Sequence, residues 1–284
     1  MWFVRDAGFA VTLMGLVCML GCVVGCSYNM FAWLGGSLLG LFLQLLLMAA
    51  ASISMAAHWF TMTTNPGVIP KGIHISPVVA TVDDESGYID GHSRTSDDFI
   101  YCEWCDAHHP KRAEHCHSCN GCVVLMDHHC PWVNNCIGAG NGKNFILMLG
   151  YIPIMCLYMV LLTVAQSWMC TVNDPSATCG FRTGMSPGRA GIWVFAISCL
   201  FMLLCAMMLG MELYSISEDM TYGEIASQLV HLQDTREHAS KLQQRLGILF
   251  GSDHAEWHWL VPGRDVHQRR REAEMDVILG YHED

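Results

Sequence analysis

The sequence predicts an all-α integral membrane protein, with four transmembrane helices and a polar, cysteine-rich domain between the second and the third. Three observations predict this class. Only 14% of the 284 residues are charged, against about 25% in soluble domains. The 52% of residues that are hydrophobic gather in long blocks, and seven of the 15 Cys and six of the 15 His fall between Cys102 and Cys136. The net charge of −11 gives no basic surface, so nucleic acid is not an expected partner.

Four apolar blocks are each long enough to cross a bilayer, which takes about 20 residues. They run from about residue 8 to 28, 34 to 60, 145 to 169 and 191 to 214. The alternative for the first block is a cleaved signal peptide, but Arg5-Asp6 is a poor basic leader and three more blocks follow. Within this block Cys18, Cys22 and Cys26 share one helix face, which we interpret as small packing residues.

The distribution of Lys and Arg predicts the orientation of the helices. Residues 61–144 hold five of these side chains and the tail after Tyr214 holds seven, whereas residues 170–190 hold two. We therefore expect both termini and the cysteine-rich domain to face the cytosol, in an endomembrane (Golgi or ER) or the plasma membrane. Cys170 and Cys179 would face the other side, where they either form a disulfide or remain two free thiols.

These elements divide the chain into four expected parts. Residues 1–60 hold a short N-terminus and the first two helices, and residues 61–144 hold a cytosolic linker and the cysteine-rich domain, with its core at 99–144. Residues 145–214 hold the last two helices with a short lumenal loop, and residues 215–284 form a cytosolic tail. Residues 72–100 are rich in Asp, Ser and Gly, which is typical of a flexible connector. We find no internal repeats.

The cysteine-rich domain has the spacing of metal ligands. Its pattern is Cys102-x2-Cys105-x9-His115-Cys116-x2-Cys119-x2-Cys122-x6-His129-x6-Cys136. Paired C-x2-C steps suit tetrahedral zinc, and a reducing cytosol favours metal over disulfides. Metal binding would also supply the folding free energy that so polar a segment lacks. Two Cys3His sites use six of the seven thiols, so one thiol is left over.

The remaining thiol is best placed at Cys130, in the run Asp127-His128-His129-Cys130. Acid, imidazole and thiol together are the components of an activated nucleophile. Because adjacent side chains of an extended segment point opposite ways, His129 can face a zinc while His128 faces Cys130 and Asp127 orients His128. The alternative makes Cys130 a spare ligand and His128 a solvated residue, and spacing alone does not separate the two.

The run from Asp127 to Gly138, DHHCPWVNNCIG, followed by Asn141-x3-Phe145, resembles the DHHC-type protein S-acyltransferases, or palmitoyltransferases. These membrane enzymes attach palmitate or related chains to cysteines of cytosolic proteins. The resemblance also covers the order of two spans, cysteine-rich loop, two spans and tail. It implies two interleaved zinc sites and a free nucleophile at Cys130. One site would be Cys102, Cys105, His115 and Cys122, and the other Cys116, Cys119, His129 and Cys136.

Shorter elements of the chain are similar to the family with substitutions. Asn65-Pro66-Gly67 resembles its Asp-Pro-Gly element, and Thr221–Glu224 its Thr-Thr-x-Glu element. The tail lacks the Asn often found in the family, although Trp257-His258-Trp259 looks similar to that region. Two amphipathic stretches of the tail, at 225–232 and 242–249, are expected to pack or lie on the membrane. Arg269–Arg271 either binds lipid headgroups or is a solvated run.

The resemblance implies acyl transfer in two steps. Cys130, deprotonated by His128, would take the acyl group from a long-chain acyl-CoA and pass it to a cysteine of a cytosolic or membrane-associated protein. The two zinc ions would be structural, and the bilayer itself is a partner. Lys111, Arg112 and Lys143 are candidates to bind the CoA phosphates, or else are ordinary positive charges beside the membrane. The alternative function is a zinc-stabilised membrane adaptor in which Cys130 is unreactive.

The length of the acyl chain suggests where its end would lie. A sixteen-carbon chain threaded from Cys130 into the helices would reach two to three turns into the third span, near Met155 and its neighbours Ile154 and Leu157. A flexible Met there would tolerate a range of chains.

Overall fold

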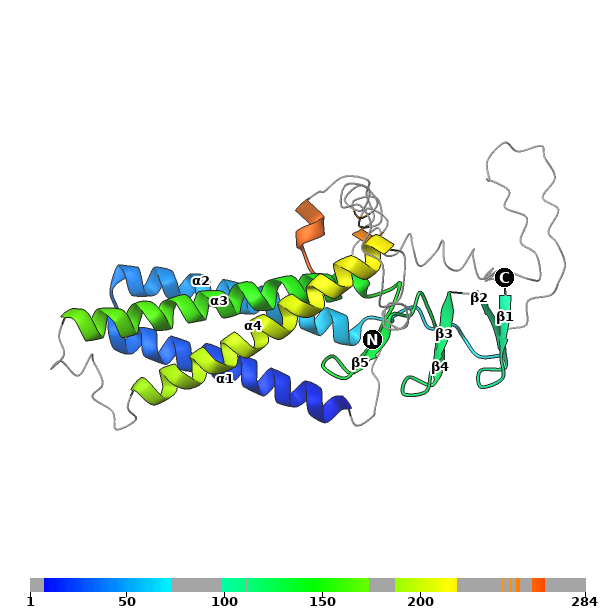
Figure 1. Ribbon diagram of the computed structural model, residues 1–284, viewed down its shortest axis with the longest axis horizontal. Helices are drawn as coiled ribbons and strands as arrows, with labels where there is room; N and C mark the ends of the chain where they lie inside the picture. Colours follow the sequence, from blue (N-terminus) through cyan, green and yellow to red (C-terminus); the bar gives the residue numbers. More distant parts are fainter. Residues whose placement is uncertain are drawn as a thin grey trace.

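The computed structural model describes residues 8–72, 99–110, 112–173 and 187–218, and in the tail residues 242, 246, 249–250 and 257–263. Four long helices form an elongated bundle, and the cysteine-rich domain lies at one end of it (Figure 1). The helices are α1 (Gly8–Leu34), α2 (Leu38–Thr63), α3 (Gly142–Asn173) and α4 (Pro187–Glu218). Of the residues expected in the tail, 221–224, 225–232 and 269–271 lie outside the described residues, as does Cys179.

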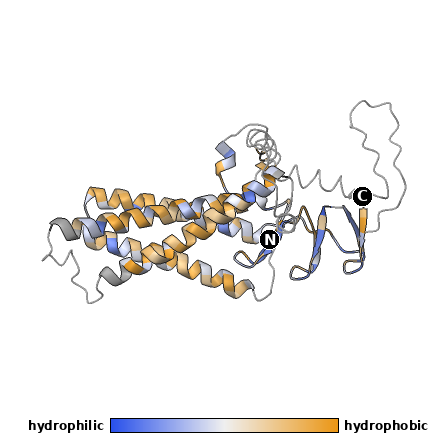
Figure 2. Ribbon diagram, viewed as in Figure 1, coloured by the Kyte–Doolittle hydropathy of each residue, from blue (hydrophilic) through white to orange (hydrophobic). Residues whose placement is uncertain are grey.

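All four helices are long and apolar enough to cross a membrane, so the predicted fold class is confirmed and the chain is a multi-pass membrane protein. Figure 2 shows hydrophobic residues along the whole bundle. Large apolar side chains such as Phe42 and Trp193 are more than half exposed on its surface, as expected where a helix faces lipid. Between the first two helices, Gly35 adopts a positive φ of 54° and Ser37 caps α2 by accepting a hydrogen bond from Gly40 N at 3.1 Å.

Helix α3 is the centre of the bundle, because 50% of its spanning window is buried, against 33% or less in the other three. Hydrogen bonds join helices in the apolar interior. The Tyr158 hydroxyl donates to the Leu43 carbonyl at 2.9 Å, and the Gln166 side chain donates to the Asn29 carbonyl at 3.3 Å. Such bonds satisfy polar groups that have no water partner in lipid.

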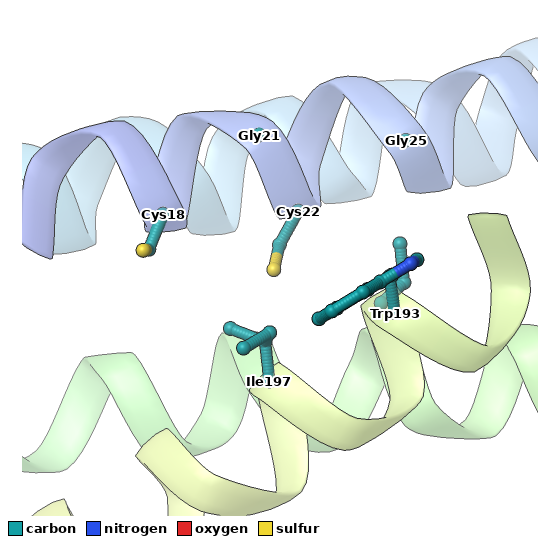
Figure 3. Close-up of a pocket in the computed structure, with 7 residues that line it drawn as sticks. Cys18, Gly21, Cys22, Gly25, Trp193 and Ile197 are labelled. Atoms are coloured by element: carbon teal, nitrogen blue, oxygen red, sulfur yellow. The ribbon is translucent and has the colours of Figure 1, made fainter. Parts of the chain in front are cut away.

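Helices α1 and α4 meet over small residues. Gly25 lies so close to α4 that an added Cβ would stand 3.0 Å from Val194. Next to this contact the two helices leave a pocket of about 230 Å³, lined by Cys18, Gly21, Cys22, Gly25, Trp193, Val194 and Ile197 (Figure 3). Cys22 and Cys26 are buried in the core between helices, in agreement with their interpretation as packing residues.

The cysteine-rich domain consists of three antiparallel hairpins rather than helices. They pair β1 (Phe99–Cys102) with β2 (Ala107–Pro110), β3 (Ala113–Cys116) with β4 (Gly121–Val124), and β5 (His128–Cys130) with β6 (Asn135–Ile137). The three hairpins follow one another away from the bundle, with β5 nearest to it (Figure 1). The all-α protein that the sequence predicted did not include these short strands.

The three hairpins are copies of one unit, so the expectation of no internal repeats is wrong for this domain. Each first strand ends in a cysteine, at positions 102, 116 and 130, that pairs with the first residue of the second strand. Each turn then contains one residue in the left-handed region, Asp106, Asn120 or Asn134, with φ between 49° and 53°. Asp and Asn tolerate this conformation better than other non-glycine residues. The repeat is fourteen residues long, and few of its other positions recur, which hides it in the sequence.

Candidate functional site

Two clusters of Cys and His lie between consecutive hairpins. In each cluster the four potential ligand atoms lie within 4.8 Å of one another. The members of the first are Cys102, Cys105, His115 and Cys122, and those of the second are Cys116, Cys119, His129 and Cys136. The structure therefore brings together the same two sets of four that the family resemblance implied.

The distances within the clusters fit a tetrahedral metal. Bond lengths to zinc of about 2.3 Å for sulfur and about 2.0–2.1 Å for nitrogen place neighbouring ligand atoms about 3.5–3.8 Å apart. In the first cluster His115 Nδ1 lies 3.6 Å from Cys102 Sγ and 3.2 Å from Cys105 Sγ. In the second, His129 Nδ1 lies 3.4 Å from Cys119 Sγ and 3.6 Å from Cys136 Sγ. Three thiols and one imidazole around one point are a closed donor set for zinc.

Neighbouring thiols in these clusters shift one another's pKa in opposite directions. Hydrogen bonds with Cys119 and Cys136 lower the pKa of Cys116, whereas hydrogen bonds with Cys116 and Cys119 raise the pKa of Cys136. One thiolate therefore forms at the expense of the next. A divalent cation at the centre relieves this conflict, because it stabilises all three thiolates together.

The clusters link the hairpins in series. The first hairpin supplies Cys102 and Cys105 to one cluster, and the third supplies His129 and Cys136 to the other. The middle hairpin contributes to both. The orientation of the third hairpin, and with it the position of Cys130, therefore depends on the second cluster.

Cys130 belongs to neither cluster, although it is on the same strand as His129. Side chains alternate along β5, so His129 faces the second cluster while Cys130 faces the other way. Its side chain is only 2% exposed and packs with the helical bundle, in the same apolar core as Phe145 and Met155. The one thiol that the ligand count leaves over is thus buried at the domain end of the membrane helices.

His128 joins Cys130 to Asp127. Its Nδ1 lies 2.7 Å from the Asp127 carboxylate, and the ring is close enough to the Cys130 thiol for the thiol to affect its pKa. Burial lowers the pKa of His128, but Asp127 and Cys130 outweigh it and raise this pKa to about 10. The ring also meets the Phe145 ring edge to face, 5.5 Å between centroids.

Comparison with known proteins identifies the family of this arrangement. The family model described as DHHC palmitoyltransferase matches residues 95–229, which include both clusters and the Asp127–Cys130 run. The chain belongs to the DHHC palmitoyltransferase family. By this membership it is a protein S-acyltransferase, as the sequence predicted.

Several named relatives of this DHHC protein are palmitoyltransferases. The chain is 29% identical to palmitoyltransferase ZDHHC3-A of Danio rerio over 234 residues, which cover 78% of this chain and 67% of the relative. It is 28% identical to palmitoyltransferase ZDHHC3 of Rattus norvegicus, over 78% of this chain and 71% of the relative. It is 32% identical to palmitoyltransferase ZDHHC7 of Rattus norvegicus over 174 residues, 60% of this chain and 52% of that one.

The loop that follows Cys130 in the DHHC hairpin is hydrogen-bonded to two membrane helices. Thr12 of α1 donates to the Pro131 carbonyl at 2.9 Å, and His58 of α2 donates to the next carbonyl, that of Trp132, at 3.0 Å. Both donors are buried, at 1% and 5% exposure. The loop is therefore held directly against the ends of α1 and α2.

Two asparagines of the DHHC motif region, to which sequence analysis gave no role, hold the end of α2. The amide of Asn135 donates to the carbonyls of Thr61, Met62 and Thr64, and that of Asn141 donates to the Thr61 carbonyl. These carbonyls belong to the last turn of a helix, where no intrahelical donor is available. Their adjacency to the cysteine motif was visible in the sequence, but their partners, more than 70 residues away, were not.

The three expected CoA-binding cations of the DHHC protein do not share one environment. Lys111 lies outside the described residues. Arg112 is exposed at the turn before β3, whereas Lys143, in the first turn of α3, is 5% exposed and lies 5.9 Å from the centre of the Phe250 ring. Lys143 therefore contacts the tail, as a cation over an aromatic face.

The described part of the tail packs on the first turns of α3. Gly263 N donates to the Asn144 side chain at 2.9 Å, and the Tyr151 hydroxyl donates to the Leu260 carbonyl. The Trp259 ring packs against that of Phe250 at a tilt of 31°, with 4.8 Å between centroids. Of the two stretches expected to pack or lie on the membrane, 225–232 lies outside the described residues, and Leu246 and Leu249 of 242–249 pack against the apolar core of the bundle.

Metal content tests the two clusters. We expect two zinc ions per purified chain, and Cys116→Ala should reduce the number to one or fewer, because a single missing ligand opens a closed tetrahedral site. Cys199→Ala, which alters a thiol of α4 outside both clusters, is the matched control and should keep both ions. A wild-type stoichiometry of one, measured by elemental analysis, would contradict the two-site scheme.

Proposed function

We propose that the protein transfers a long-chain, palmitate-like acyl group from acyl-CoA to Cys130, and from there to cysteines of cytosolic or membrane-associated proteins. One observation carries this proposal. Of the seven cysteines in the domain, Cys130 alone lies outside both metal clusters, and it lies close to His128, whose Nδ1 is 2.7 Å from the Asp127 carboxylate. An adaptor without catalysis needs neither a spare thiol nor an acid–imidazole pair beside it.

In the first step His128 accepts the proton of the Cys130 thiol. Asp127 holds the ring through Nδ1, so that Nε2 is available to the thiol, and it stabilises the imidazolium that forms. The thiolate attacks the carbonyl carbon of the acyl-CoA thioester, and the bond from that carbon to the CoA sulfur breaks. His128 returns the proton to the departing CoA thiolate.

The second step repeats this exchange with a new thiol. His128 takes the proton of the substrate cysteine, the resulting thiolate attacks the acyl-Cys130 thioester, and Cys130 leaves as a thiolate that recovers the proton. Both steps exchange one thioester for another, so little bond energy changes and catalysis depends on positioning. The hydrogen bonds that fix the Pro131–Trp132 loop to α1 and α2 support such a role.

Each cluster would hold one zinc ion through its three thiolates and one imidazole. With four protein ligands a zinc ion has no open position, so it would supply folding free energy and fix the hairpins. The chemistry itself is left to Cys130, His128 and Asp127.

The burial of Cys130 supports a path for the acyl chain into the bundle. Met155 is 1% exposed and shares the apolar core of Cys130, whereas its neighbours Ile154 and Leu157 are 60% and 46% exposed on the outer surface. We infer that the acyl chain lies between the helices, with its end near Met155. The CoA head would stay at the domain end of the bundle, where Arg112, Lys111 and Lys143 are candidates for its phosphates.

The positive charges near the helix ends support a cytosolic position for the domain, the tail and the N-terminus. This orientation would place Cys130 on the side of the membrane where acyl-CoA and cytosolic protein thiols are present. We propose an endomembrane or the plasma membrane as its site.

Replacement of the nucleophile tests the enzyme against the adaptor. Purified wild-type protein incubated with a labelled long-chain acyl-CoA should take up hydroxylamine-sensitive label, and Cys130→Ser should take up none while keeping both zinc ions. Cys199→Ser should label like wild type. Loss of zinc from Cys130→Ser would make Cys130 a ligand, and label retained on that variant would place the acyl group elsewhere.

Replacing the two adjacent histidines one at a time should have different effects on zinc content and on acylation. His128→Ala should keep both zinc ions and slow self-acylation by about 10²–10⁴-fold, the range for loss of a general base. His129→Ala should lose one zinc ion and lower the yield of folded protein. The reverse pattern in metal analysis and labelling rates would overturn this assignment.

Side-chain size at Met155 should set the preferred chain length. Met155→Ala should shift the preference toward longer acyl-CoAs and Met155→Trp toward shorter ones, because they lengthen and shorten the space for the chain. Ile154→Ala, one residue away on the outer surface, is the matched control. The measurement is competition between acyl-CoAs of different lengths, and an unchanged profile in both Met155 variants would remove this residue from the path.

A further inference from the structure

The turn that follows Cys130 is anchored by its backbone to two different membrane helices. Thr12 of α1 donates to the Pro131 carbonyl at 2.9 Å, and His58 Nε2 of α2 lies 3.0 Å from the Trp132 carbonyl. A carbonyl oxygen only accepts hydrogen bonds, so Nε2 of His58 carries a hydrogen and donates it. The two donors reach consecutive carbonyls from separate helices, and together they fix both the position and the orientation of the turn.

These two donors are unusual among the polar side chains of the bundle. Thr12 is 1% exposed and His58 is 5% exposed, and both lie inside helices that are apolar enough to span a membrane. A buried threonine in a helix can bond to its own backbone, as Thr163 does to the Met159 carbonyl at 2.8 Å. Thr12 instead bonds to a residue 119 positions away. An ionisable side chain such as that of His58 is costly within a span and, in membrane proteins, usually serves a function.

The turn passes its position on to Cys130. Val133 N donates back to the Cys130 carbonyl at 3.3 Å, so residues 130–133 form one closed turn. The Trp132 ring also meets the Phe201 ring of α4 edge to face, with 6.3 Å between centroids. Without its backbone anchors the turn could shift along the bundle, and Cys130 would shift with it. The chemistry is sensitive to such a shift, because a misplacement of about 1 Å can cost about 10²-fold in rate.

We propose that Thr12 and His58 are positioning residues for acyl transfer, which hold the Pro131–Trp132 turn so that the Cys130 thiol stays buried against the bundle. The inference rests on the proposed function. Both residues act through the backbone of the turn. Their loss should therefore have two opposite effects on Cys130, which is now 2% exposed. The thiol should become more accessible to a small reagent and less reactive toward acyl-CoA.

The first test removes each donor from the full-length protein. Thr12→Val and His58→Phe should each slow self-acylation by about 10-fold at saturating long-chain acyl-CoA, less than the roughly 10²-fold of a 1 Å displacement because the other anchor remains. The KM for acyl-CoA should change little, since the lost interaction orients the thiol. Thr12→Ser and His58→Gln, which keep a donor, should recover most of the rate. Thr163→Val, which removes a buried hydroxyl that bonds within its own helix, is the matched control.

Alkylation by iodoacetamide distinguishes positioning from damage to the fold. Cys130 should be modified faster in Thr12→Val and His58→Phe than in wild type, although the same variants are acylated more slowly. Peptide mass spectrometry assigns the modified thiol. Cys156, 1% exposed in the core of the bundle, should stay unmodified in every variant, and both zinc ions should remain.

Three results would overturn the inference. They are a wild-type acylation rate in both Thr12→Val and His58→Phe, equal losses in the variants that keep and remove the donor, and alkylation of Cys130 that is unchanged or that rises together with that of Cys156. In each case label on wild type, absent from Cys130→Ser, leaves the proposed function standing. No label on wild type would overturn both.

Discussion

The joining of consecutive hairpins through shared four-ligand clusters is the interaction on which the rest of the domain depends. Each hairpin has only two strands of three or four residues, which are not stable alone in water. The apolar cores around the clusters are small and consist partly of the cysteines themselves. The ligands from neighbouring hairpins therefore hold the domain together in place of a large hydrophobic core. A metal ion at the centre of each cluster would stabilise the joined hairpins.

The third hairpin transmits this order to the membrane. Its far end is held by the second cluster through His129 and Cys136, and its turn is held by Thr12 and His58 of the first two helices. Hydrogen bonds to backbone carbonyls are stronger constraints here than in water, because the surroundings offer few other partners. Cys130 lies between these two attachments, so its position relative to the bundle is fixed from both sides.

The alternation of side chains along β5 separates the metal ligand His129 from His128 and Cys130. Alternation along β5 gives His129 to the cluster, while His128 and Cys130 share the opposite face toward the helices. The third hairpin repeats the cysteine of the first two at position 130 but has Val133 where they have Cys105 and Cys119. Without that second thiol, and with the turn packed on the bundle, Cys130 is left out of the clusters. The third hairpin, which resembles the two metal-binding hairpins before it, thus holds the buried thiol of Cys130.

The sequence by itself determined the four helices and the presence of two Cys3His sites with one thiol left over, because these follow from local composition and spacing, whereas the division of the ligands between the two sites came from the family resemblance. Apolar length is enough to predict a spanning helix, and the C-x2-C steps bring two thiols of one turn together. The three-hairpin repeat was not recognised, since only the cysteine and the left-handed turn residue recur in all three hairpins and the strands are very short. Tertiary structure alone decided which distant groups meet. The partners of Asn135 and Thr12 lie 71 and 119 residues away, and no local pattern encodes a hydrogen bond across that separation.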